Sequence, residues 1–163
     1  MTVIDELLEN ATAYAQGLEK KGLAMPPAKR VAIVACMDAR LNPYGLLGLS
    51  EGDAHVIRNA GGVISEDTIR SLAISQRLLG TEEIMLIHHT DCGMLSFHDD
   101  DFRNQIEQET GIKPAWAAEA FNDPETDVRQ SIARLQTNPF IPHKEKIRGF
   151  VYQVETGRLR EVN

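Results

Sequence analysis

Apolar residues recur at helical spacing near the N-terminus of this chain. From Ile4 to Leu18 they follow each other at intervals of three and four residues, with Thr2 as the expected cap and Gly22 as the expected stop. Two consecutive prolines come next, and prolines do not continue a helix. The pattern therefore predicts an amphipathic helical arm with a proline-bearing hinge over residues 1–27.

The rest of the chain alternates strand-like runs with helix-like segments. A continuous apolar run, typical of a strand covered on both faces, lies at residues 30–35, and two further strands are expected at residues 54–58 and 83–88. Helical periodicity bounded by caps, glycines and prolines lies at residues 65–80, 100–109 and 124–138. The last segment, residues 148–162, has a turn at Glu155-Thr156-Gly157 and predicts a hairpin.

Strands that alternate with helices predict an α/β fold: a mostly parallel central sheet with helices on both faces. The N-terminal helical arm precedes this sheet, and a C-terminal antiparallel strand or hairpin ends it. A chain of 163 residues, 42% of them hydrophobic, is expected to form one domain over residues 1–163. Such sheets bind ligands at the carboxyl ends of their strands. Side chains that follow the first and third strands are therefore expected to meet at one rim.

Charge and composition narrow the choice of partners. The chain has 17 Lys and Arg against 24 Asp and Glu, a net charge of -7, which disfavours nucleic acid and anionic lipid as partners. The N-terminus lacks the basic region of a secretory signal, and no apolar stretch approaches membrane-spanning length. We therefore expect a cytoplasmic protein. Its two cysteines are expected to serve chemistry or metal binding, because disulfides do not persist in a reducing compartment.

Cysteine and histidine stand where two predicted strands end. Cys36 follows the first strand, and His89 and Cys92 follow the third. Two thiolates and one imidazole suit zinc, and three protein ligands leave the fourth tetrahedral position open, as in catalytic sites. The alternative is that both cysteines are small buried hydrophobes and the histidine a core residue. The residues alone leave both interpretations open.

Two charged residues follow Cys36 directly past the buried strand. Charge is costly there unless it is paired or functional, and Asp38 with Arg40 can form such a pair. With Arg40 keeping it ionised, Asp38 could accept the hydrogen of a zinc-bound hydroxide and turn its lone pair toward an electrophile. The alternative is a structural ion pair that caps a loop.

Three separated motifs carry a family resemblance. They are C-M-D-A-R at 36–40, R-N-A-G-G at 58–62 and H-T-D-C-G-M at 89–94, and they resemble the β-class carbonic anhydrases. The similarity runs from about Val31 to about Val154 and is greatest to the short archaeal and actinobacterial type.

The resemblance implies a carbonate dehydratase that contains zinc. Cys36, His89 and Cys92 would be the zinc ligands, and Asp38 with Arg40 the catalytic pair. The implied reaction is the reversible hydration of carbon dioxide to bicarbonate by a zinc-bound hydroxide. The resemblance also implies a homodimer or dimer-based oligomer, in which the N-terminal helix embraces the neighbouring subunit.

Other residues of these motifs receive weaker predictions. Arg58, Asn59, Gly61 and Gly93 are expected to line the substrate pocket. The neighbour of the histidine ligand, His88, should point to the opposite face of its strand and belong to the core. Two residues have no assigned role: Asp91, most simply a solvated loop acid, and Trp116.

Two rival functions stay open, and a third is disfavoured. The same zinc site could hydrolyse carbonyl sulfide or carbon disulfide, because both are linear electrophiles. A non-catalytic zinc-binding protein would need a fourth ligand, which Asp38 could supply. A phosphatase-like enzyme with Cys36 as nucleophile is disfavoured, because no glycine-rich loop separates it from Arg40.

Overall fold

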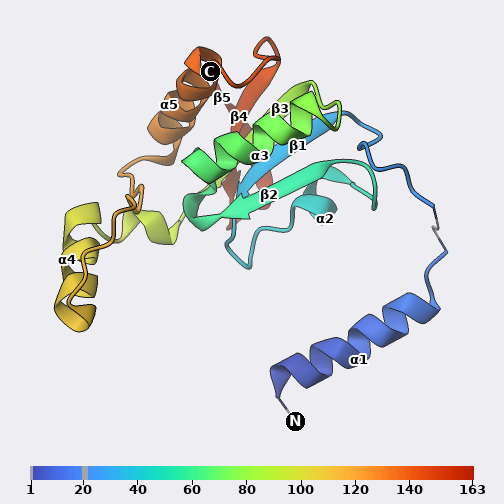
Figure 1. Cartoon of the computed structure of the whole chain (residues 1–163), viewed down its shortest axis with the longest axis horizontal. Helices are drawn as coiled ribbons and strands as arrows, with labels where there is room; N and C mark the ends of the chain where they lie inside the picture. The colour runs from blue at the N-terminus through green and yellow to red at the C-terminus, as the bar shows by residue number, and fades with distance from the viewer. Residues whose placement is uncertain (1, 20–21) are drawn as a thin grey trace.

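Five strands form one sheet in the computed structural model, which describes residues 2–19 and 22–163 (Figure 1). In sheet order they are β2 (His55–Asn59), β1 (Val31–Cys36), β3 (Glu83–His89), β4 (Ile147–Gln153) and β5 (Arg158–Val162). The first four run parallel, and β5 pairs antiparallel with β4. The predicted fold class, a mostly parallel sheet that ends in an antiparallel hairpin, is confirmed.

One face of the sheet is covered by α3 (Glu66–Arg77) and α5 (Pro124–Thr137). Leu72 of α3 and Leu135 of α5 are fully buried in a core that also holds Leu86 of β3. Burying a leucine side chain contributes about 1.5–3 kcal/mol, so this layer stabilises the fold strongly. Both helices were predicted from their apolar periodicity.

The opposite face is covered by shorter elements. They are the helix α2 (Pro43–Leu47) and the 3₁₀ turns η1 (Ala60–Gly62) and η2 (Gly93–Leu95). A second core on this face contains Cys36 and Cys92. The sequence pattern did not indicate α2, because five residues are too few to repeat a helical period.

The N-terminal helix α1 (Val3–Gln16) begins at its predicted cap. Thr2 accepts a hydrogen bond from the Asp5 backbone N–H, and Asp5 accepts one from Thr2, which forms a capping box. The predicted stop at Gly22 was wrong, because the helix ends before Gly17, whose N–H caps the last turn. Figure 1 shows α1 standing away from the sheet, and none of its residues is buried.

Helix α4 (Asp99–Thr110) projects from the other end of the molecule (Figure 1). It has no buried residue of its own, and the left-handed Gly111 ends it as the sequence predicted. Throughout residues 2–19 and 22–163, no helix has the length and apolar character needed to cross a bilayer. The cytoplasmic location stays a prediction.

Candidate metal centre

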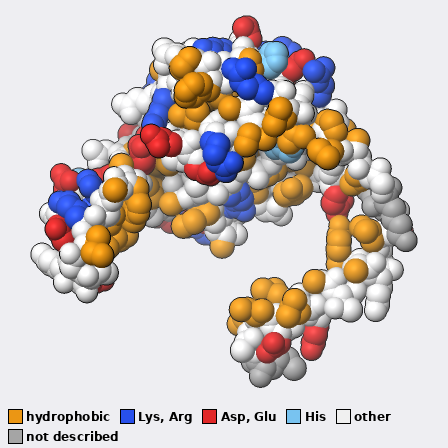
Figure 2. Space-filling view, viewed as in Figure 1, with side chains coloured by type: hydrophobic (Ala, Val, Ile, Leu, Met, Phe, Trp, Pro, Cys, Tyr) orange, Lys and Arg blue, Asp and Glu red, His pale blue; other side chains and the backbone are white. Residues whose placement is uncertain are grey.

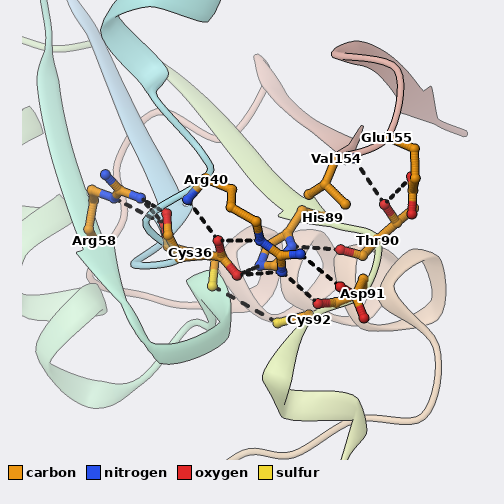
Figure 3. Close-up of polar contacts among 10 residues, drawn as sticks. Cys36, Arg40, Arg58, His89, Thr90, Asp91, Cys92, Val154 and Glu155 are labelled. Carbon is orange, nitrogen blue, oxygen red and sulfur yellow. Dashed lines mark hydrogen bonds and ion pairs between the residues drawn. The ribbon is translucent and has the colours of Figure 1, made fainter.

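The carboxyl ends of β1 and β3 lie side by side and bring the three predicted ligands together (Figure 3). The two strands are neighbours in the sheet, and their register pairs Ala35 with Ile87. Cys36 is the last residue of β1 and His89 the last of β3, with Cys92 in the loop that follows. The ligand atoms of these three buried residues all lie within 4.8 Å of one another.

The donor atoms have the spacing that a tetrahedral zinc requires. Two sulfurs bound to one zinc at about 2.3 Å stand roughly 3.8 Å apart, and Cys36 Sγ lies 4.0 Å from Cys92 Sγ. His89 Nδ1 lies 2.7 Å from the Thr90 carbonyl oxygen, which places its proton on Nδ1 and leaves the Nε2 lone pair free. Nε2 is buried and has no hydrogen-bond partner among the described residues. A cation at the meeting point would satisfy it, so the site fits zinc.

The two thiols shift each other's pKa. A hydrogen bond from Cys92 stabilises the Cys36 thiolate and lowers the pKa of Cys36 to about 4. That thiolate, together with burial, raises the pKa of Cys92. A cation that bound both sulfurs would displace the thiol proton that Cys92 retains.

Asp38 and Arg40 form the predicted ion pair beside the ligands. Arg40 Nε and Nη2 donate to the two oxygens of Asp38 at 3.0 and 2.8 Å, and the Arg40 backbone N–H donates to Oδ1 at 2.9 Å. These bonds lower the pKa of Asp38 well below its usual range. Asp38 Oδ2 lies 3.7 Å from His89 Nε2, so an ionised carboxylate faces the meeting point of the ligands.

Asp91 holds Arg40 from a second side (Figure 3). Arg40 Nη1 donates to Asp91 Oδ2 at 2.7 Å, and Nη2 donates to the Asp91 carbonyl oxygen at 2.9 Å. Asp91 has φ 52, in the left-handed region. Asp91 has no role in the sequence interpretation, because the strand pattern places its loop beside that of Arg40 but does not show which side chains of the two loops are in contact.

Two of the predicted pocket residues bond to backbone around the site. Arg58 donates to the Cys36 carbonyl oxygen from Nε and Nη2 at 3.0 and 2.7 Å, and to the Asp38 carbonyl oxygen from Nη2 at 2.8 Å. The Asn59 side chain accepts from the Val63 N–H and donates to the Val63 carbonyl, both at 2.9 Å. Arg58 thus fixes the loop that carries the ion pair, and Asn59 fixes the turn after β2. Their contact with substrate stays a prediction.

Glycines let the backbone approach the ligands closely. Gly62 has φ 69, and a Cβ there would lie 2.9 Å from Cys36 N and 3.1 Å from the Ile87 carbonyl oxygen. Gly61 has φ 85, and its Cβ would contact a methionine side chain at 2.9 Å. By contrast, a Cβ on Gly93 would meet no described atom within 4 Å. The close approach therefore requires glycine at 61 and 62, and the pocket role of both Gly61 and Gly93 stays a prediction.

His88 points away from the ligands, as predicted. It is fully buried, and its Nε2 lies 2.7 Å from Asp127 Oδ2 on α5. Its ring stacks on Phe121 at 5.2 Å between centroids. The expectation that His88 belongs to the core is confirmed.

Known proteins share both the sequence and this arrangement of strands. A family model described as carbonic anhydrase matches residues 31–159. Beta-carbonic anhydrase 1 of Mycobacterium tuberculosis is 60% identical over 162 residues, which cover 99% of each chain. The chain belongs to the β-carbonic anhydrase family.

Two further relatives show how far the likeness of this β-carbonic anhydrase extends. The solved carbonic anhydrase of Streptococcus mutans has 43% identity and a TM-score of 0.93, covering 100% of this chain and 99% of the other. A carbon disulfide hydrolase of Acidianus sp. is 32% identical, covering 98% of this chain and 89% of the relative. The predicted family and enzyme class are confirmed.

Proposed function

We propose that this β-carbonic anhydrase catalyses the reversible hydration of carbon dioxide to bicarbonate and a proton, with zinc held by Cys36, His89 and Cys92. The observation that carries the proposal is the convergence of two buried sulfurs and an unpartnered ring nitrogen, beside a carboxylate that an arginine holds. The 60% identity to the mycobacterial beta-carbonic anhydrase 1 supports the choice of substrate.

When bound, zinc would supply Lewis acidity, which lowers the pKa of a coordinated water so that a nucleophile exists near neutral pH. The residues of the protein itself orient the nucleophile. Asp38 stays ionised because of Arg40, so its carboxylate can only accept a hydrogen bond. A water-derived nucleophile that donates its hydrogen to Asp38 must turn a lone pair away from the carboxylate and toward the substrate carbon.

The site chemistry also sets an expected pH dependence. Two thiolate ligands would neutralise the charge of a divalent cation. A water bound to that cation would then be harder to deprotonate than a water bound to a cation with neutral ligands alone. Turnover is therefore expected to rise toward alkaline pH. A rate that stays flat down to mildly acidic pH contradicts this expectation.

Substitution of Asp38 tests the proposal. Asp38→Ala should keep its zinc, because the three ligands remain, while turnover falls by about 100-fold or more. Metal analysis and stopped-flow hydration measure the two effects. The control is Asp67→Asn, which removes the charge of another carboxylate that pairs with an arginine, at an exposed position on α3.

The outcomes of this test separate the roles of Asp38. Unchanged turnover in Asp38→Ala removes the carboxylate from the mechanism. Loss of zinc assigns Asp38 to metal binding, as the non-catalytic alternative requires. The three hydrogen bonds from Arg40 favour the catalytic role, because a carboxylate that turned to bind the metal would have to give up bonds to Arg40.

The likeness to a carbon disulfide hydrolase favours a second substrate class. An acceptor that orients a nucleophile would serve any linear electrophile with a central carbon. Assays with carbon dioxide, carbonyl sulfide and carbon disulfide on one zinc-loaded preparation separate the candidates. We expect carbon dioxide to have the highest kcat/KM, and a higher value for carbon disulfide would overturn the proposed substrate.

We further propose that the chain forms a homodimer through α1. The apolar positions Ile4, Leu7 and Leu8 are exposed, and Figure 2 shows apolar side chains gathered along this helix. Apolar side chains in such a row mark an association surface. A second copy of the chain is the partner that the family resemblance implies, with residues 1–27 as the exchanged arm.

A further inference from the structure

We propose that Asp91 is a positioning residue: it holds Arg40, and through Arg40 the Asp38 carboxylate, in the orientation that the hydration reaction proposed above requires.

The guanidinium of Arg40 lies between two aspartates. It donates from Nε and Nη2 to the Asp38 carboxylate, and from Nη1 and Nη2 to the carboxylate and carbonyl of Asp91. Four of its five N–H groups are therefore used by these two residues. Because the guanidinium group is planar, hydrogen bonds along two of its edges hold it against rotation. Hydrogen bonds along a single edge do not hold it in this way.

The bonds to Asp91 connect two separate loops. Asp38 and Arg40 both lie in the loop after β1, so their mutual contact does not tie them to the loop after β3. Asp91 lies between the ligands His89 and Cys92 in the loop after β3. Its contact with Arg40 therefore fixes the carboxylate of Asp38 relative to the ligands that come from the other strand.

The environment of Asp91 indicates a task other than stabilisation. Its side chain is 72% exposed and that of Arg40 is 48% exposed, and ion pairs in water contribute little to stability. Asp91 also adopts φ 52, a left-handed conformation that asparagine tolerates as well as aspartate does, so the backbone alone does not require a carboxylate here. A carboxylate at this position is therefore best explained by its bond to Arg40.

The test variant is Asp91→Asn in the zinc-loaded protein. Asparagine has the same size, tolerates the left-handed backbone and keeps the carbonyl bond to Arg40, so only the charge is lost. The matched control is Asp67→Asn, because Asp67 is 73% exposed and its carboxylate lies 2.8 Å from Arg70 Nη2. Circular dichroism and zinc content should be the same in both variants and in the wild type.

The first readout is the ¹⁵N spectrum of the arginine side chains, which does not depend on turnover. In the wild type, rotation of the Arg40 guanidinium is hindered, and its two Nη groups should give separate signals. In Asp91→Asn they should merge, because the bond of Nη1 to a carboxylate is weakened. Arg148, which Glu161 holds with two bonds of 2.6 Å, is the internal reference and should not change. Arg40→Gln assigns the signals.

The second readout is a double-mutant cycle in kinetics. Asp91→Asn should lower kcat about three- to tenfold with KM unchanged, because orientation is lost while substrate binding is not. In an Arg40→Gln background the same substitution should have no further effect, since Asp91 acts through Arg40.

Three results would overturn the proposal. They are unchanged Arg40 signals in Asp91→Asn, an equal loss of kcat in both backgrounds, and loss of zinc from Asp91→Asn. A wild type without hydration activity would instead overturn the proposed function, and the ¹⁵N readout would still decide whether Asp91 positions Arg40.

Discussion

At the metal centre, contacts within the chain bury the two sulfurs and hold the ion pair beside them, whereas helix α1 leaves its apolar side in water. Cys36 and Cys92 are only 4% and 5% exposed, beside an ion pair held from several sides. Leu7 and Leu8 of α1 are 58% and 61% exposed. The difference shows that contacts within one chain set the site, whereas α1 can bury its apolar residues only by association.

Loss of a ligand should have the largest effect on the centre and none on α1. Cys92→Ala removes one of three donors, so zinc affinity should fall by more than about 100-fold. That figure is the upper end of the loss seen when a residue that merely orients a ligand is replaced. Competition with a chromogenic chelator measures the affinity, and hydration activity should fall with it. Zinc affinity equal to that of the wild type would exclude Cys92 from the ligand set.

A methyl group placed behind the ligands should be the next most damaging change. Gly62→Ala puts a Cβ against backbone atoms of β1 and β3 at a positive φ, so it should lower the free energy of unfolding by about 2–4 kcal/mol. The control is Gly157→Ala in the hairpin turn, where φ is 70 and no described atom lies within 4 Å of the new Cβ. It should cost only about 1 kcal/mol. Chemical denaturation measures the free energy of unfolding of both variants. Equal losses of stability would show that the positive φ, and not the close contact of the new Cβ, causes the cost.

Acid should weaken the centre while leaving α1 unchanged. The pKa of Cys36 is lowered and that of Cys92 is raised, so zinc displaces the proton of Cys92, and the raised pKa of His89 adds a second competing proton as the pH falls. Apparent zinc affinity should therefore fall at least about tenfold for each unit by which the pH is lowered between roughly pH 8 and 5. Chelator competition at several pH values measures the slope, and a slope of zero contradicts this competition between protons and zinc.

A charge on α1 should have the smallest effect on the centre and act on assembly instead. Leu8→Glu places a carboxylate on the apolar side of the helix, so we expect a shift from dimer to monomer with unchanged zinc content. Asn10→Glu, on the opposite side of the helix, is the control and should stay dimeric. Light scattering coupled to size-exclusion chromatography measures the mass. A dimeric Leu8→Glu protein would show that α1 is not the interface.

The sequence predicts the strands and the long helices because their apolar patterns repeat along the chain. It predicts the three convergent ligands because they lie at or just after the ends of strands. Cys36 and His89 end neighbouring parallel strands, so the α/β pattern alone brings them to one rim. The contacts of Asp91 and Arg58 could not be predicted, because they depend on a left-handed backbone and on carbonyl groups of a distant loop. The end of α1 was misplaced because the helix stops at Gly17, one residue before Leu18, the last apolar position of its stripe.

The position of the two cysteines has a thermodynamic consequence beyond chemistry. They lie 56 positions apart, Cys36 at the end of one central strand and Cys92 in the loop after its neighbour, so a cation bound to both would act as a crosslink between the middle strands of the sheet. Closing a loop of that length in an unfolded chain costs roughly 4 kcal/mol of conformational entropy. Removal of the ion should therefore lower the melting temperature of the whole domain. The supply of the cation would then set the amount of folded enzyme in a cell as well as its rate of turnover.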